Sequence, residues 1–102
     1  MTIPTLTGYP DTPTTCRVWC RWCCTWHIHG QEDPDEIRHR VAHCGQHSPY
    51  WHSSYHMRGT ATPWDQVRRT IRTASIAQQN VISRGETTPA IDRLRAQPDP
   101  EP

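Results

Sequence analysis

The sequence predicts a small metal-stabilised domain, α+β or mostly α, built from a cysteine knuckle and a short helix and followed by one or two C-terminal helices. All five cysteines and all seven histidines of the 102 residues lie between Cys16 and His56. The apolar fraction is 33%, below the roughly 45–50% of ordinary globular domains. A short chain with so few aliphatic side chains needs a metal or disulfides to hold it together. Helix-start signals are found at Asp33, Thr62 and Thr88, each followed by a proline.

The N-terminal third begins with residues 1–15, in which three prolines stand among many threonines. Proline fixes φ and restricts the residue before it, so this stretch predicts an extended, flexible arm.

Residues 16–26 read CRVWCRWCCTW, and aromatic and β-branched side chains there favour a short strand or knuckle. Three tryptophans are expected to form the core, or alternatively an aromatic platform for a partner or for bases: Trp19, Trp22 and Trp26.

A helix is predicted from Asp33 to Cys44. Asp33 is suited to the N-cap and Pro34 to the first helical position. Gly45 is typical of the residue just beyond a helix C-terminus. Together with the preceding knuckle and the loop that follows, this helix completes a predicted zinc-binding mini-domain over residues 16–58.

The remaining residues, 59–97, predict a helical C-terminal segment. One helix begins near Thr62, with Pro63 at its first position, and ends at Gly85. A short further helix begins at Thr88 with Pro89. The apolar stripe of the longer helix consists of Val67, Ile71, Ala74 and Ile82. The proline-rich tail, residues 98–102, is predicted to be disordered.

The crowded cysteines and histidines predict a zinc site, because thiolate and imidazole are preferred zinc ligands. Cys20-x2-Cys23 is one knuckle, in which a two-residue gap lets both sulfurs reach one ion. The second pair has to come from the region 39–47. Three pairs compete there: His39 with His43, His43 with His47, and Cys44 with His47.

Helical phase favours the last pair. At about 100° per residue, Ile37, Val41 and Cys44 share one face of the predicted helix. The two aliphatic residues mark that face as buried, and Gly45 permits a turn that brings His47 round. We therefore expect Zn²⁺ in a closed, structural Cys3His site, with an iron–sulfur cluster as the alternative metal group. The predicted ligands are Cys20, Cys23, Cys44 and His47, with His43 in reserve.

The order Cys20, Cys23, His39, His43 resembles that of Cys2His2 zinc fingers, although the spacing between Cys23 and His39 is longer than in that family. Residues 20–47 more generally resemble small Cys/His zinc-finger accessory proteins of actinobacteria and their phages. The exclusive use of arginine among the 11 basic residues is typical of GC-rich genomes and agrees with that source. The resemblance implies a regulatory or accessory role.

The predicted function is nucleic-acid binding, with phosphate contacts from Arg68, Arg69 and Arg72, since arginine pairs bidentately with phosphate oxygens. The alternative is an adaptor or a phage-encoded inhibitor of a host protein, with Val67, Ile71 and Ile82 presented to a partner groove. The net charge of +1 gives the chain no overall positive field that would attract nucleic acid. No catalytic constellation is visible, so an enzyme is not expected.

The predicted compartment is the reducing cytoplasm of a bacterium or of a phage-infected host cell, where thiols stay free to bind metal. No apolar stretch approaches the roughly 18–20 residues that span a membrane. The N-terminus also lacks the charged and then apolar pattern of a signal peptide. The oligomeric state and the identity of the partner stay open.

Overall fold

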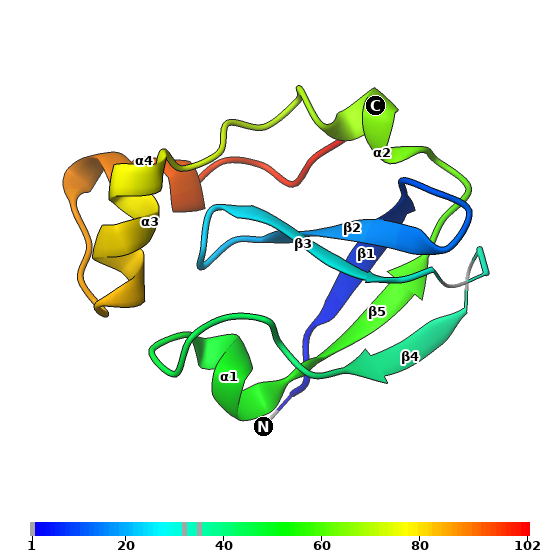
Figure 1. The fold of residues 1–102 in the computed structure, drawn as a ribbon, viewed down its shortest axis with the longest axis horizontal. Coiled ribbons are helices and arrows are strands. Elements are labelled where there is room, and N and C mark those ends of the chain that lie inside the picture. The colour runs from blue at the N-terminus through cyan, green and yellow to red at the C-terminus, as the bar shows by residue number, and fades with distance from the viewer. Residues whose placement is uncertain (1, 32, 35) are drawn as a thin grey trace.

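The computed structural model describes residues 2–31, 33–34 and 36–102. Within them the chain forms one five-stranded sheet and four short helices (Figure 1). The fold is therefore α+β and sheet-rich, and the mostly helical alternative is wrong. The elements are β1 (Thr5–Pro10), β2 (Thr15–Cys20), β3 (Thr25–Gly30), β4 (Ile37–Arg40), α1 (Pro49–Ser53), β5 (Tyr55–Gly59), α2 (Trp64–Val67), α3 (Ile76–Ser83) and α4 (Pro89–Arg95).

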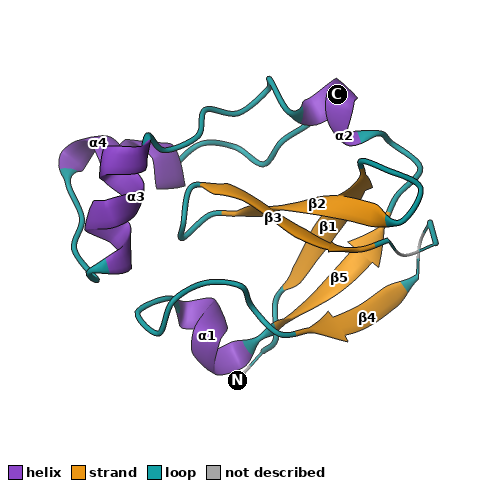
Figure 2. Cartoon of the chain, in the orientation of Figure 1, coloured by secondary structure: helices purple, strands orange, loops and turns teal. Residues whose placement is uncertain are grey.

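The strands lie in the order β3-β2-β1-β5-β4. β1 pairs parallel to β5, and the other neighbours are antiparallel. Figure 2 shows the strands between α1 on one side and the segment carrying α2, α3 and α4 on the other. Each face of the sheet can therefore bury its own set of side chains.

Two apolar clusters follow from the alternation of side chains along the strands. Along β2, Val18 and Cys20 face one cluster and Trp19 faces the other. The first, the cysteine cluster, consists of Cys16, Val18, Cys20, Ala42, Cys44, Tyr55 and Met57. The second, the C-terminal cluster, consists of Trp19, Cys24, Ile71, Ala74, Ile82, Ile91 and Leu94.

The predicted N-terminal arm contributes a central strand. Within residues 1–15, β1 lies between β2 and β5. Gly8 is buried, and a Cβ atom there would lie 2.9 Å from Met57 Sδ and 3.1 Å from Cys16 Sγ. Pro10 stands at the strand's last position, so the amide that proline lacks falls at the end of the ladder. Threonine, leucine and tyrosine suit a pleated surface, and this preference outweighs the proline signal.

The predicted helix from Asp33 to Cys44 is wrong. β4 occupies Ile37–Arg40 at the sheet edge and a loop follows it; Asp35 lies outside the described residues. Ile37 and Val41, expected to be buried, are 49% and 72% exposed. The cap signals at Asp33 are local, and helix propensity is only a weak prior. Pairing with β5 satisfies the backbone of residues 37–40 in the sheet and overrides both.

The long C-terminal helix divides into α2 and α3. The amide of Ala74 donates to the carbonyl of Cys24 at 2.8 Å, so this amide does not take part in a helix. α3 then starts afresh at Ser75, whose side chain forms a capping box with Gln78. Gly85, with φ of 77°, ends α3 as predicted. The predicted helix with Thr88 as its cap and Pro89 at its first position is confirmed as α4.

The C-terminal segment packs against the sheet instead of presenting an apolar stripe. Val67, Ile71 and Ile82 are 0%, 6% and 4% exposed, so the surface expected of an adaptor lies in the core. The tail, predicted to be disordered, also contacts the sheet: Pro100 is buried and its carbonyl accepts from the Tyr9 hydroxyl at 3.2 Å.

Across the described ranges, no helix combines the length and the apolarity that crossing a bilayer requires.

Candidate metal centre

The turn between β2 and β3 holds the first two candidate ligands. β2 ends at Cys20, and the amide of Cys24 donates to the Cys20 carbonyl at 2.8 Å. The amide of Cys23 points to Cys20 Sγ at 3.4 Å. Cys24 closes the turn with a left-handed backbone, φ 54°. This tight turn places the sulfurs of Cys20 and Cys23 on the same side, as the two-residue spacing predicts.

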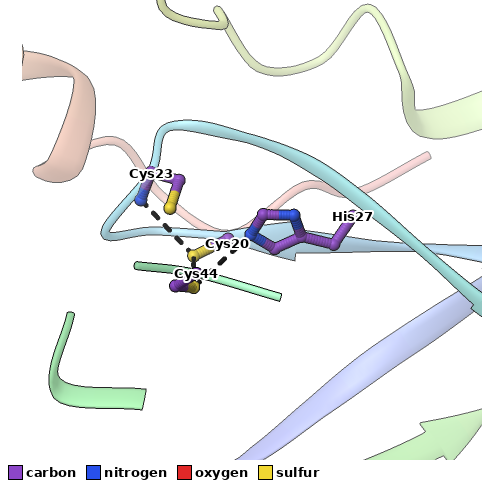
Figure 3. Close-up of side chains that lie close together, drawn as sticks. All are labelled: Cys20, Cys23, His27 and Cys44. Carbon is purple, nitrogen blue, oxygen red and sulfur yellow. Dashed lines mark hydrogen bonds between the residues drawn. The ribbon is translucent and has the colours of Figure 1, made fainter. Parts of the chain in front are cut away.

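Strand β3 and the loop after β4 bring two further side chains to the same point (Figure 3). His27 lies opposite Val18 in the β2–β3 ladder, so it shares the face of Cys20. Cys44 Sγ lies 3.3 Å from Cys20 Sγ and 3.4 Å from His27 Nε2. The ligand atoms of four residues all lie within 4.8 Å of one another: Cys20, Cys23, His27 and Cys44.

These distances fit one tetrahedral ion. Sulfur ligands at the corners of a tetrahedron with metal bonds of about 2.3 Å lie about 3.8 Å apart. The separations of 3.3 and 3.4 Å lie a few tenths of an ångström below that value, and all four ligand atoms lie within 4.8 Å of one another. Cys20 and Cys44 are 1% and 5% exposed, and Cys23 and His27 are half-buried. Four protein ligands close the coordination shell, which is the pattern of a structural site.

The thiols at the centre share their protons unequally. Hydrogen bonds with Cys20 and then Cys23 lower the pKa of Cys44, and burial opposes this shift. Hydrogen bonds with His27 and with the buried Ser48 lower the pKa further. The Cys23 and Cys44 contacts, followed by burial, raise the pKa of Cys20. Because the thiolate is the form that binds metal, a metal ion would displace the protons that these thiols retain.

Neighbouring side chains enclose the centre. His29, 7% exposed, bonds to the Tyr55 hydroxyl through Nε2, and burial lowers its pKa to about 4. Its ring stacks on His43, with centroids 4.1 Å apart. An uncharged His29 adds no repulsion toward a cation beside it. A cavity of about 170 Å³ lies next to the ligands, with Cys23, His27, His43, Cys44 and His47 in its wall.

Of the residues predicted as ligands, the structure brings together Cys20, Cys23 and Cys44. His47 and the reserve His43 are exposed and lie outside the group whose ligand atoms converge. The His47 ring packs near Gly85, where an added Cβ would lie 2.8 Å from its Cγ. The helical-phase reasoning selected Cys44, but it assumed a helix that the chain does not form.

Sequence reasoning missed His27. The available signal was the alternation of β3: residues 25, 27 and 29 pair with residues 20, 18 and 16, so they share the face of the cysteine at position 20. Recognising the hairpin would therefore have placed His27 beside the knuckle. The turn-like composition of residues 27–32 favoured a loop instead.

The three predicted phosphate-binding arginines are exposed. Arg68 lies over the Trp64 ring at 4.9 Å and 3.5 Å from Asp65. Arg72 donates through its amide and Nε to Gln97 Oε1 at 2.9 and 3.3 Å. These two arginines therefore lie just after α2, and each already uses some of its N–H donors for contacts within the protein.

Comparisons with protein-family models, with curated proteins and with solved structures give no significant match for this chain.

Proposed function

We propose that this chain is a small zinc-organised accessory protein that binds nucleic acid. The observation that supports zinc is the convergence of three thiols and one imidazole from three segments, in a geometry that closes around one ion. Three sulfur ligands and one nitrogen ligand suit zinc, and four protein ligands favour a structural role over a catalytic one. The ion ties the β2–β3 turn to the loop that carries Cys44.

The nucleic-acid part of the proposal is supported by the exposed arginines of residues 68–72. Trp64 carries two guanidinium groups, Arg68 at 4.9 Å and Arg17 at 4.5 Å from the ring centroid. Stacking restrains a guanidinium, so less rotamer freedom is lost when it pairs with a phosphate. An adaptor role is disfavoured because the apolar side chains that it would present are buried: Ile71 and Ile82 lie in the C-terminal cluster, and Val67 is 0% exposed.

The proposal is tested by measuring retention of the zinc-loaded protein on short single-stranded and duplex DNA and RNA across a salt series. We expect binding at low salt that weakens steeply as salt rises, because each phosphate contact releases counterions. Changing Arg68, Arg69 and Arg72 together to alanine should lower the slope of log K against log salt by about 2 to 3.

The matched control has the same change in net charge at three other exposed arginines. The triple change of Arg38, Arg84 and Arg93 to alanine removes these charges away from the 68–72 turn. It should leave most of the binding intact. Absence of nucleic-acid retention by the unaltered protein at the lowest salt would overturn the proposed function, and equal losses in both triple variants would overturn the proposed contact surface.

A further inference from the structure

The tip of the cysteine knuckle forms one wall of a cavity that the metal centre does not use. The two residues between the knuckle cysteines, Arg21 and Trp22, meet the start of α1 and the end of α4 there. The cavity has a volume of about 260 Å³, and its lining residues are Arg21, Trp22, Pro49, Tyr50 and Arg95. Two aromatic rings and a proline thus stand beside two guanidinium groups in a single concave site.

The cationic side of this cavity is held in place. Arg95 stacks on the Trp22 ring at 3.8 Å, and its Nε donates to the Trp22 carbonyl at 2.9 Å. Arg21 donates to the backbone carbonyls of Arg95 and Gln97 and to the carboxylate of Asp99. Asp99 is the acidic partner in this network, and its side chain is 85% exposed. The two guanidinium groups are therefore preorganised and only partly neutralised.

The aromatic side is also fixed. Tyr50 is half-buried and packs on the cysteine cluster, and its ring meets Tyr55 edge to face at 5.8 Å. Its amide donates to the Ser48 hydroxyl at 3.1 Å, which sets the start of α1. Trp22 packs against both apolar clusters. Rigid rings cost little conformational entropy when a flat ligand stacks on them.

Hydrogen bonds link the cavity to Arg72, one of the arginines of the proposed nucleic-acid surface. Gln97 joins them: its backbone carbonyl accepts from Arg21, and its side-chain oxygen accepts from the amide and Nε of Arg72. Arg72 therefore lies one residue away from the rim. A chain molecule bound at Arg72 through a phosphate would therefore lie beside a residue that also contacts the cavity wall.

We propose that this cavity receives an unpaired base, so that the nucleic acid bound by the protein is single-stranded. The inference rests on the proposed function and specifies its ligand. A base stacks on the ring of Tyr50, since Arg95 already covers the ring of Trp22. Arg21, Arg72 and Arg95 face the neighbouring phosphates, and this combination binds single strands without strict sequence preference. A base within a duplex stays stacked on its neighbours and does not enter such a cavity.

The decisive experiment compares Tyr50→Leu with Tyr50→Phe in the zinc-loaded full chain, using a short oligothymidylate and a duplex of the same length as ligands. Leucine keeps the apolar bulk that packs on the cysteine cluster but removes the ring, whereas phenylalanine keeps the ring. We expect Tyr50→Leu to weaken oligothymidylate binding about 5- to 150-fold and Tyr50→Phe to leave it unchanged. The unaltered protein should bind the single strand more tightly than the duplex.

A second measurement needs no variant and covers the case in which Tyr50→Leu fails to fold. An oligothymidylate carrying 5-iodouracil is photocrosslinked to the unaltered protein, and the modified residue is identified by mass spectrometry. Crosslinks at Trp22 or Tyr50 support the site. Tighter binding of the duplex, or crosslinks confined to Trp64, would overturn it.

The failures of the two proposals are distinguishable. If Tyr50→Leu binds as the unaltered protein does while the Arg68, Arg69 and Arg72 triple variant loses binding, the cavity proposal falls and the proposed function stands. If the unaltered protein retains neither ligand at low salt, both fall. Selective capture of an acidic peptide by the same cavity, with no affinity for oligothymidylate, would overturn the cavity proposal. If the duplex is not retained either, the proposed function falls as well.

Discussion

Cys24 is the residue on which the knuckle closes, and it carries a backbone conformation that is uncommon for anything except glycine. Its φ of 54° lets the chain reverse within the turn, at some cost in backbone strain. Glycine would avoid that strain, but the Cys24 side chain is fully buried in the C-terminal cluster. The residue therefore serves two roles at once, turning the knuckle and anchoring the helices that pack behind it.

The identity of the fourth ligand is tested by two histidine changes. His27→Ala should reduce the zinc content and zinc affinity of the purified protein, because it removes one of four converging ligand atoms. His47→Ala should keep one zinc per chain, since its ring lies outside that group. Elemental analysis and competition with a zinc chelator measure both, with Cys44→Ser as the positive control. Loss of zinc in His47→Ala but not in His27→Ala would reverse the assignment.

Low thiol reactivity is expected for Cys16 and Cys24, the two cysteines outside the metal centre. Burial is the main reason why the pKa values of Cys16 and Cys24 are raised, so both stay protonated beyond the ordinary range of a thiol. The thiolate is the reactive form. In the zinc-loaded protein, we expect iodoacetamide to modify them slowly at neutral pH and to accelerate only at a higher pH than it does with free cysteine. Labelling of either residue at the rate of the free amino acid would contradict their burial.

At the scale of elements, pairing between distant segments decides what local signals leave ambiguous. β1 carries prolines nearby and β4 follows a good helix cap, yet both join β5 in the sheet. Similarly, a hydrogen bond from Ala74 to Cys24 interrupts a helix that the apolar stripe alone would continue. By contrast, α4 forms where its cap and proline predict it, because its local preferences and its packing agree.

Gly8→Val tests whether β1 belongs to the sheet. The new side chain would collide with Met57 and Cys16, both buried, so we expect the free energy of unfolding to fall by about 1–3 kcal/mol. Thr5→Val places the same new residue at an exposed position of β1, where the native threonine is already β-branched, and should change little. Thermal or denaturant unfolding of the zinc-loaded proteins measures both. Equal stability of Gly8→Val and the unaltered protein would mean that residues 1–15 are an arm.

Considered as a whole, the molecule has two apolar clusters that are joined at the cysteine knuckle. The cysteine cluster and the C-terminal cluster meet at the knuckle, and Trp22 packs against both. The metal ligands join the β2–β3 hairpin to the loop that carries Cys44, and Arg21 and Trp22 in turn hold the end of α4. One ion would therefore stabilise the loop directly and the C-terminal segment indirectly.

Metal removal should loosen these parts before the sheet. Under chelation, at a temperature below global unfolding, we expect faster amide hydrogen exchange in residues 41–48 and 89–97. The central strands β1 and β5 should keep their protection, because their ladder does not involve the ligands. Exchange measured by mass spectrometry, with zinc added back as the control, follows this change. Unaltered exchange in α4 would show that the knuckle does not hold the C-terminal helix.

The sequence by itself determined that cysteines and histidines crowd into one part of this chain, that Cys20 and Cys23 form a knuckle, and where α4 begins. Each of these follows from spacing, residue type or a cap, which act over a few residues. Only the tertiary structure decided that Cys44 and His27 join Cys20 and Cys23 in a group that could hold a metal ion, that β1 is a central strand and that residues 37–40 form a strand. These depend on strand pairing and register, which join segments far apart in the chain and cannot be read from local preference.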